Sequence, residues 1–130
     1  MLITSIPQYI QGITNAKIDL TGTSATTLFT VPSDADFNAA VVNSILVSNE
    51  SPNADTITVN LTDTAGAVFS LFNLKSVGAN TTVELLTKDL ILESGEILKV
   101  QAATANRLHV VASIQELSKT RVTTSAISRI

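Results

Sequence analysis

Strict alternation of apolar and polar residues is the feature that most restricts the fold of this chain. In Thr56–Thr62, the apolar residues Ile57, Val59 and Leu61 alternate with Thr and Asn. Successive side chains of a β-strand point to opposite faces, so this spacing places the apolar side chains on one face and the polar ones on the other. A helix would instead need apolar residues three and four positions apart. The segment therefore predicts a strand with one buried and one solvated face.

The same pattern returns along the chain from residue 26 onward. Leu98–Ala102 and Arg107–Gln115 alternate clearly, and other runs are more continuously apolar but rich in the β-branched residues that favour strands. Gly, Pro, Asn and Asp separate the runs and predict turns. With a short strand at Lys17–Leu20, we expect eight to nine strands in an all-β chain, arranged as an antiparallel sandwich or barrel. The continuously apolar runs are Val41–Val47, Val68–Leu74 and Thr82–Leu86.

Composition indicates a surface with unusually little charge. Charged residues make up 15% of the 130 positions, against about 25% in ordinary soluble proteins. The chain has 18 Thr, 13 Ser and 9 Asn, so neutral hydroxyl and amide groups must cover much of its surface. A hydrophobic content of 45% and a net charge of −3 argue against disorder.

Several classes of protein are excluded by what the chain lacks. It has no Cys, which rules out disulfides, thiolate metal sites and cysteine nucleophiles. A pI near 4.9 and an aromatic content of 4% argue against nucleic-acid binding. Residues 1–10 do not resemble a signal peptide, and no apolar run is long enough to cross a membrane. We expect a soluble protein that is made in the cytoplasm.

The two ends of the chain differ from its middle. We predict an N-terminal arm over residues 1–16, a β-sandwich domain over 17–115 and a C-terminal arm over 116–130. Both arms contain apolar residues that need cover, and residues 116–130 contain three basic groups and one acidic group, whereas residues 1–115 contain five basic and ten acidic groups. This uneven distribution of charge suits a basic arm that lies on the acidic body of a neighbouring copy, where the opposite charges fix the position of the arm. A frayed C-terminal tail is the alternative.

His109 is the only imidazole in the chain. Its position between Leu108 and Val110 places it on the outward face of the expected strand. A catalytic histidine needs an orienting carboxylate and a nucleophile, and the spacing of the sequence assigns neither. A histidine at the surface or in an interface is the simpler interpretation.

Acidic loop residues are the other candidates for a site. Asp34, Asp36, Asp55 and Asp63 together offer oxygen ligands of the kind that Ca²⁺ requires, or hydrogen-bond acceptors for a carbohydrate. Aspartates in loops more often form turns and solubilise the chain.

Paired carboxylates for glycoside hydrolysis, chosen from Glu84, Glu93 and Glu96, are not distinguishable from solvated charges. The glycines are isolated and form no phosphate-binding loop. The sequence therefore predicts no catalytic, cofactor-binding or metal-binding residues, no cofactor, and a protein that is not an enzyme. The glycines are Gly12, Gly22, Gly66, Gly78 and Gly95.

One long stretch resembles the small β-sandwich proteins of tailed-phage particles. The resemblance covers about two-thirds of the chain, Thr26–Ile114, and begins with a Thr-Val-Pro strand that leads to a long strand ending in Ser-Asn and then to alternating Thr and Val. Further on, a motif of the form Leu-x-x-Gly-x-x-Leu-x-Val is matched by Leu92, Gly95, Leu98 and Val100. The family contributes no catalytic or cofactor residues.

This resemblance implies a jelly-roll-like sandwich with extended arms and a structural role in a virion. The first expectation is a capsid decoration (cement) protein, located in the virion, that binds between subunits of the major capsid protein or beside other virion proteins. A neck or tail component of the particle is the alternative, and a carbohydrate- or calcium-binding module is a third. The family suggests a homo-oligomer, with a trimer as our guess, and neither nucleic acid nor membrane as a partner.

Overall fold

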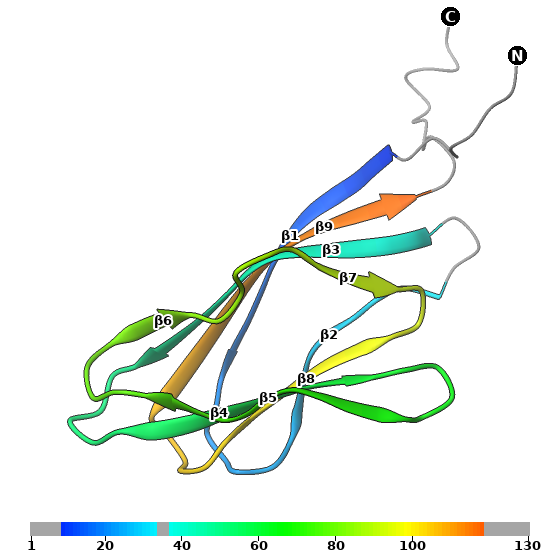
Figure 1. The fold of residues 1–130 in the computed structure, drawn as a ribbon. Coiled ribbons are helices and arrows are strands. Elements are labelled where there is room, and N and C mark those ends of the chain that lie inside the picture. Colours follow the sequence, from blue (N-terminus) through cyan, green and yellow to red (C-terminus); the bar gives the residue numbers. More distant parts are fainter. Residues whose placement is uncertain (1–8, 34–36, 119–130) are drawn as a thin grey trace, which may run out of the picture.

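The computed structural model describes residues 9–33 and 37–118, which form nine β-strands and no helix (Figure 1). The expected all-β sandwich is confirmed. Within these residues there is accordingly no helix that is long and apolar enough to cross a membrane. The strands are β1 (Tyr9–Asp19), β2 (Thr26–Thr30), β3 (Phe37–Asn49), β4 (Asp55–Thr62), β5 (Val68–Val77), β6 (Thr82–Glu84), β7 (Leu90–Glu93), β8 (Ile97–Ala102) and β9 (Leu108–Ser118).

The strands form two antiparallel sheets that pack face to face (Figure 1). Sheet A has the order β1-β9-β3-β6, with β7 also paired to β3, and sheet B has the order β2-β8-β4-β5. Most consecutive strands of the chain lie in different sheets, so the connections cross repeatedly from one sheet to the other. This order is that of a jelly roll, in which β6 and β7 together fill one strand position.

The core lies between the sheets, and the alternation of the sequence decides which side chains enter it. In β4, Ile57 and Val59 are fully buried, while the intervening Thr58 is partly exposed. In β9, Leu108, Val110, Ala112 and Ile114 are all fully buried. The faces predicted for these two strands are confirmed.

An interruption between β6 and β7 departs from the strand expected at Thr82–Leu86. The Glu84 carboxylate accepts hydrogen bonds from the Ser44 hydroxyl and from the backbone nitrogen of Ile45, the latter at 2.8 Å. Its side chain thus takes the place of a backbone acceptor beside β3, where the register of β3 shifts between Val42 and Ser44. The strand ends at Glu84 for this reason, and pairing with β3 resumes at Leu90.

Two strands are longer than the sequence predicted. The strand expected at Lys17–Leu20 begins at Tyr9, because β1 pairs along its length with β9, and β9 continues to Ser118. Both strands cross the predicted limits of the arms, at residues 16/17 and 115/116. The remaining parts of the predicted arms, residues 1–8 and 119–130, lie outside the described residues.

Candidate functional site

The strand registers arrange the outward side chains of sheet A in rows that run across the strands. One row joins Ile13, Gln115, Val41 and Ile91, from β1, β9, β3 and β7 respectively. A second row joins Lys17, Val111, Leu46 and Glu84, from β1, β9, β3 and β6. Apolar side chains therefore reach the outside of this sheet from at least four strands.

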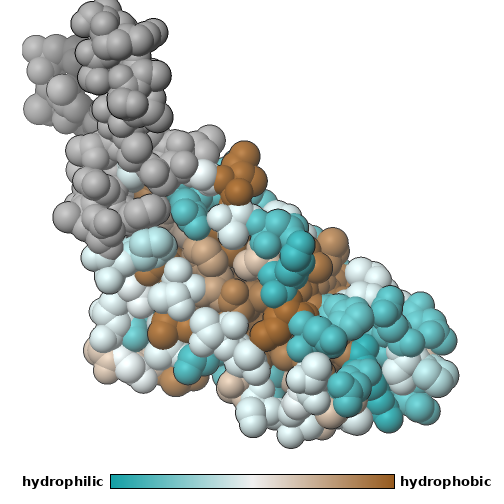
Figure 2. Space-filling model, turned by 180° about the vertical axis from the view of Figure 1, so that it is seen from behind, coloured by the Kyte–Doolittle hydropathy of each residue, from teal (hydrophilic) through white to brown (hydrophobic). Residues whose placement is uncertain are grey.

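Three of these apolar side chains are exposed: Ile13 at 78%, Ile91 at 56% and Leu46 at 40%. Isolated exposed apolar residues are normal, whereas several on one face are typical of an interaction surface. The space-filling view from behind likewise shows hydrophobic residues at the surface among neutral and hydrophilic ones (Figure 2). The sequence analysis did not predict this apolar surface. The pattern that could have indicated it is an apolar residue at an outward position of a strand, as at Leu46 between the buried Ile45 and Val47.

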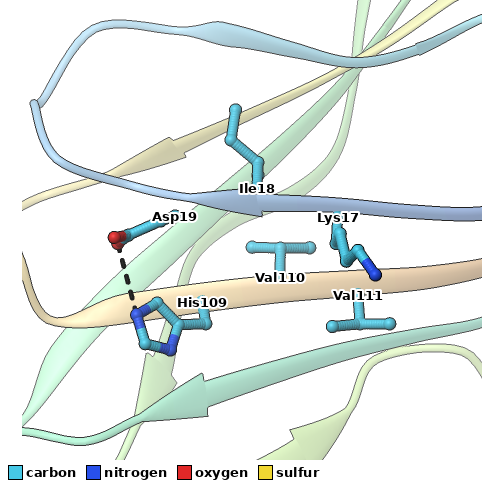
Figure 3. A pocket seen from close by; sticks show the side chains of 6 residues that line it. All are labelled: Lys17, Ile18, Asp19, His109, Val110 and Val111. Atoms are coloured by element: carbon cyan, nitrogen blue, oxygen red, sulfur yellow. Dashed lines mark ion pairs between the residues drawn. The ribbon is translucent and has the colours of Figure 1, made fainter.

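His109 lies on the same outer face, as its position in the sequence predicted. Its Nε2 is 3.3 Å from Asp19 Oδ1, and its Nδ1 is 3.4 Å from Glu50 Oε2. Figure 3 shows the histidine and Asp19 facing each other from β9 and β1. The ring thus connects carboxylates on both sides of β9. Ser48 is paired with His109 across the β3–β9 ladder, but both ring nitrogens face carboxylates, so this geometry does not activate a hydroxyl.

A shallow hollow of about 320 Å³ lies beside the histidine. Lys17, Ile18 and Asp19 of β1 and His109, Val110 and Val111 of β9 line it (Figure 3). The surface of the hollow is mostly apolar, and Lys17, Asp19 and His109 supply its polar groups. An open, mostly apolar hollow can take up an apolar side chain.

The two described aspartates of the predicted acidic loops do not meet. Asp55 begins the eight-residue strand β4 and Asp63 follows its end, so their α-carbons are roughly 26 Å apart. Asp55 Oδ2 accepts a hydrogen bond from the backbone of Thr104, and Asp63 Oδ1 accepts from Ala65 and Ala67 in the β4–β5 turn. Each therefore holds a turn. Asp34 and Asp36 lie outside the described residues, and the described part contains no cluster of His, Asp or Glu suited to a metal ion.

The three glutamates considered for hydrolysis have separate structural surroundings. Partial burial works to raise the pKa of Glu84, but hydrogen bonds from the Ser44 hydroxyl and from neighbouring backbone N–H groups outweigh it and lower the pKa below its usual 4.5. Glu96 is 9% exposed and accepts a hydrogen bond from the backbone nitrogen of Glu93 at 2.7 Å. The Glu93 side chain is exposed. Two of the three carboxylates thus support the backbone.

A second apolar surface lies at the open side of the sandwich, around β5. Strand β5 is an edge of sheet B, and its Val68, Phe69 and Leu74 are 61%, 52% and 62% exposed. A groove of about 490 Å³ separates β5 from the β6–β7 connection. Its lining is mainly leucine and phenylalanine, with Lys75, Lys88 and Asp89 among the polar residues.

Comparison with known proteins gives a fold but no family. No family model matches the chain, and no curated protein matches it. A chain in the acid-stable capsid structure of Helicobacter pylori bacteriophage KHP30 is 15% identical, with a TM-score of 0.56, and the match covers 85% of this chain and 91% of that one. The fold is like that of a viral capsid protein. At this identity the likeness is one of fold.

Two further solved structures are more distant. A pentameric capsid protein from metagenomic phage sequences is 19% identical with a TM-score of 0.45, and the match covers 78% of this chain and 59% of that one. A chain of infectious bursal disease virus, strain Gt, is 12% identical with a TM-score of 0.40, and the match covers 86% of this chain and 32% of that one. Neither is close enough to carry an argument.

Proposed function

We propose that this chain is a non-enzymatic structural protein of a phage particle, a decoration protein that binds between subunits of the capsid and stabilises the shell. The observation that carries the proposal is the match with the KHP30 capsid chain, which covers 85% of one chain and 91% of the other. The likeness therefore involves the whole sandwich. The resemblance of Thr26–Ile114 to small sandwich proteins of tailed phages supports the same role from the sequence.

The surface supports a role in assembly. Apolar side chains are exposed on both sheets, with Ile13 and Ile91 on sheet A and Phe69 and Leu74 on sheet B. Only 15% of the residues of the chain are charged. Neighbouring subunits therefore bury few ions when they cover the surface, and each buried ion costs several kcal/mol. The partners that fit are subunits of the major capsid protein, other virion proteins and further copies of this chain, arranged as a homo-oligomer for which we suggest a trimer.

Locating the protein in an electron-microscopy map of its parent particle tests the proposal. We expect density for the sandwich on the outside of the capsid, at positions between capsid subunits, in hundreds of copies. Absence of the protein from purified particles would overturn the proposal.

A neck or tail component is the second candidate, because the fold does not distinguish positions in a particle. Quantitative mass spectrometry of purified particles separates the two. A dozen copies or fewer indicate a ring in the neck or tail, whereas a number close to that of the capsid subunits indicates a shell protein.

A calcium- or carbohydrate-binding module is the third candidate from the sequence. The separation of Asp55 and Asp63 disfavours one compact site that contains both. Calorimetric titration of the purified protein with Ca²⁺ and with a panel of glycans tests this candidate, and saturable heat in either titration would favour it over a purely structural role.

A further inference from the structure

We infer that the outer face of sheet A binds residues 119–130 of a second copy of this chain. The inference deepens the proposed structural role, since it names the partner of this face and the segment that the partner contributes. The inference rests on the proposed function in one respect, because a contact between copies needs many copies at a high local concentration.

The charge of the face is the first argument. Six of the nine acidic residues in the described part lie on strands of sheet A or directly beside them. Three basic residues share these segments, and one of them, Arg107, donates a hydrogen bond to the carbonyl of Ala54. On sheet B, Asp55 and Glu96 are buried. Accessible negative charge is thus concentrated on sheet A, at Asp19, Glu50, Glu84, Asp89 and Glu93. Glu116 lies on the inner face, where it accepts a hydrogen bond from the Thr14 hydroxyl, and adds nothing to the outer face.

The apolar rows on the same face are the second argument. Ile13 and Ile91 lie in one row, and Leu46 lies in the row that ends at Glu84. A ligand for this face therefore needs apolar side chains interspersed with positive charge. Neither a purely basic nor a purely apolar segment would satisfy both parts of the surface.

Residues 119–130, KTRVTTSAISRI, have this composition. They contain three basic residues, no acidic residue and no Pro, and Val122, Ile127 and Ile130 stand among them. Twelve extended residues reach about 40 Å, which exceeds the width of a four-stranded sheet, about 15 Å. The segment is therefore long enough to cross the face and place both isoleucines on it. The basic residues are Lys119, Arg121 and Arg129.

The direction of β9 favours a second copy as the source of the segment. Ser118, the last residue of β9, is still paired with Tyr9 on one side and with Phe37 on the other. Strand β9 therefore runs between its two neighbours to the end of sheet A (Figure 1). The outer face of the same copy lies back along the strand from Ser118, so a segment that covered it would have to reverse the direction of β9. A neighbouring copy can receive the segment without a reversal of the chain.

The groove beside β5 is a poorer acceptor. Its apolar lining is comparable, but its two cations, Lys75 and Lys88, outnumber its one carboxylate, Asp89. The excess positive charge repels a segment with three basic and no acidic side chains. Strand β5 of sheet B, which forms one side of this groove, thus provides a matched control surface.

Site-directed cross-linking tests the inference, because the full chain contains no Cys. One full-length copy carries Ser113→Cys, at an exposed position of β9 on the outer face of sheet A. A second, mass-tagged copy carries Ser128→Cys within the segment. After mixing and mild oxidation, we expect the mixed disulfide to form at least tenfold faster than with the control Ser70→Cys, at an exposed position of β5 on sheet B.

Equal rates with the two acceptors, or a faster reaction with Ser70→Cys, would overturn the inference. A single chain that carries both Ser113→Cys and Ser128→Cys provides the other decisive outcome. If it closes an internal disulfide at high dilution faster than the two copies join, the segment covers its own sheet and the second copy is excluded.

Charge reversal shows whether the basic residues direct the contact. Adding Arg121→Glu and Arg129→Glu to the Ser128→Cys copy should slow the reaction with Ser113→Cys about tenfold. Adding Thr123→Gln and Thr124→Gln should change it less than twofold. An unchanged rate after charge reversal would contradict the inference.

Failure of the inference and failure of the proposed function are distinguishable. If the protein is absent from particles, the proposed function fails but the cross-linking result still stands. If the protein is present in particles but the cross-link does not form, the inference fails but the proposed function still stands.

Discussion

The side-chain amide of Asn49 lies 3.2 Å from the carbonyl oxygen of Val77 and joins the end of β3 in sheet A to the end of β5 in sheet B. The same side chain donates to the carbonyl of Asn53 at 2.9 Å and accepts from the backbone nitrogen of Ser51 at 2.9 Å. Asn49 is 1% exposed. One buried amide thus connects two sheets and a loop.

Asn49→Ala should lower the free energy of unfolding by about 2 to 4 kcal/mol, because it leaves buried backbone groups without partners. Chemical denaturation measures the change. Asn73→Ala, at an exposed position of β5, is the control and should stay within about 0.5 kcal/mol of the wild type. Equal effects of the two substitutions would show that the amide does not stabilise the junction.

Gly95→Ala should also destabilise the protein. Gly95 has a φ of +85°, and a Cβ there would lie 2.8 Å from Thr64 Cγ2. We expect a loss of about 1 to 3 kcal/mol from the backbone conformation and the clash. Gly22→Ala is the matched control, since a Cβ at Gly22 meets nothing within 4 Å. Thermal unfolding of both variants distinguishes a required glycine from a tolerant one.

The sequence was sufficient to predict the strands whose two faces differ. In β4 and β9 each buried residue has polar or partly exposed neighbours, so one local rule gives both the strand and its orientation. In β1 the rule is obscured, because Ile13 is apolar yet 78% exposed and the register shifts between Ile10 and Gly12. Alternation is consequently weak where the strand begins, and no local pattern indicates that the strand extends to Tyr9.

Contacts between residues that are far apart in the sequence could not be predicted from local patterns. Asn49 is one of the asparagines that predict turns between the strands, but its bond to Val77 spans 28 residues. Nothing in the sequence around Glu84 predicts that its carboxylate replaces a backbone acceptor beside β3, because that role depends on the pairing of β3 with β6. The outer face of sheet A could not be assembled from the sequence for the same reason, because its rows follow from strand order and register.

Glu84 should make stability depend on pH in the acidic range. Its pKa is lower in the folded protein than the usual 4.5, so its contribution to stability is complete above about pH 4.5 and is lost as the pH falls through the folded pKa. Glu84→Gln removes the charge and turns an amide group toward donors. The variant should be less stable than the wild type at pH 7, and the difference should shrink below pH 4.5.

Glu93→Gln is the control for this pH dependence, because Glu93 is an exposed glutamate of the neighbouring strand β7. Denaturant titrations from pH 3 to pH 7 give the comparison. A gap between the wild type and Glu84→Gln that is constant with pH would contradict the assigned role of the carboxylate.

Thr62 and Thr58, on the same strand β4, should respond in opposite directions to substitution by Val. Thr62 Oγ1 is buried and has no hydrogen-bond partner in the described part of the chain, whereas Thr58 Oγ1 accepts a hydrogen bond from the backbone nitrogen of Leu74 at 3.1 Å. Val has nearly the shape of Thr without the hydroxyl, so Thr62→Val removes an unsatisfied group and should raise the free energy of unfolding by about 1 kcal/mol. Thr58→Val removes the hydrogen bond from Leu74 and should lower the free energy of unfolding by about 0.5 to 1 kcal/mol. Denaturant unfolding of both variants at one pH measures the sign of each change, and a loss of stability in Thr62→Val would show that its hydroxyl is satisfied in solution.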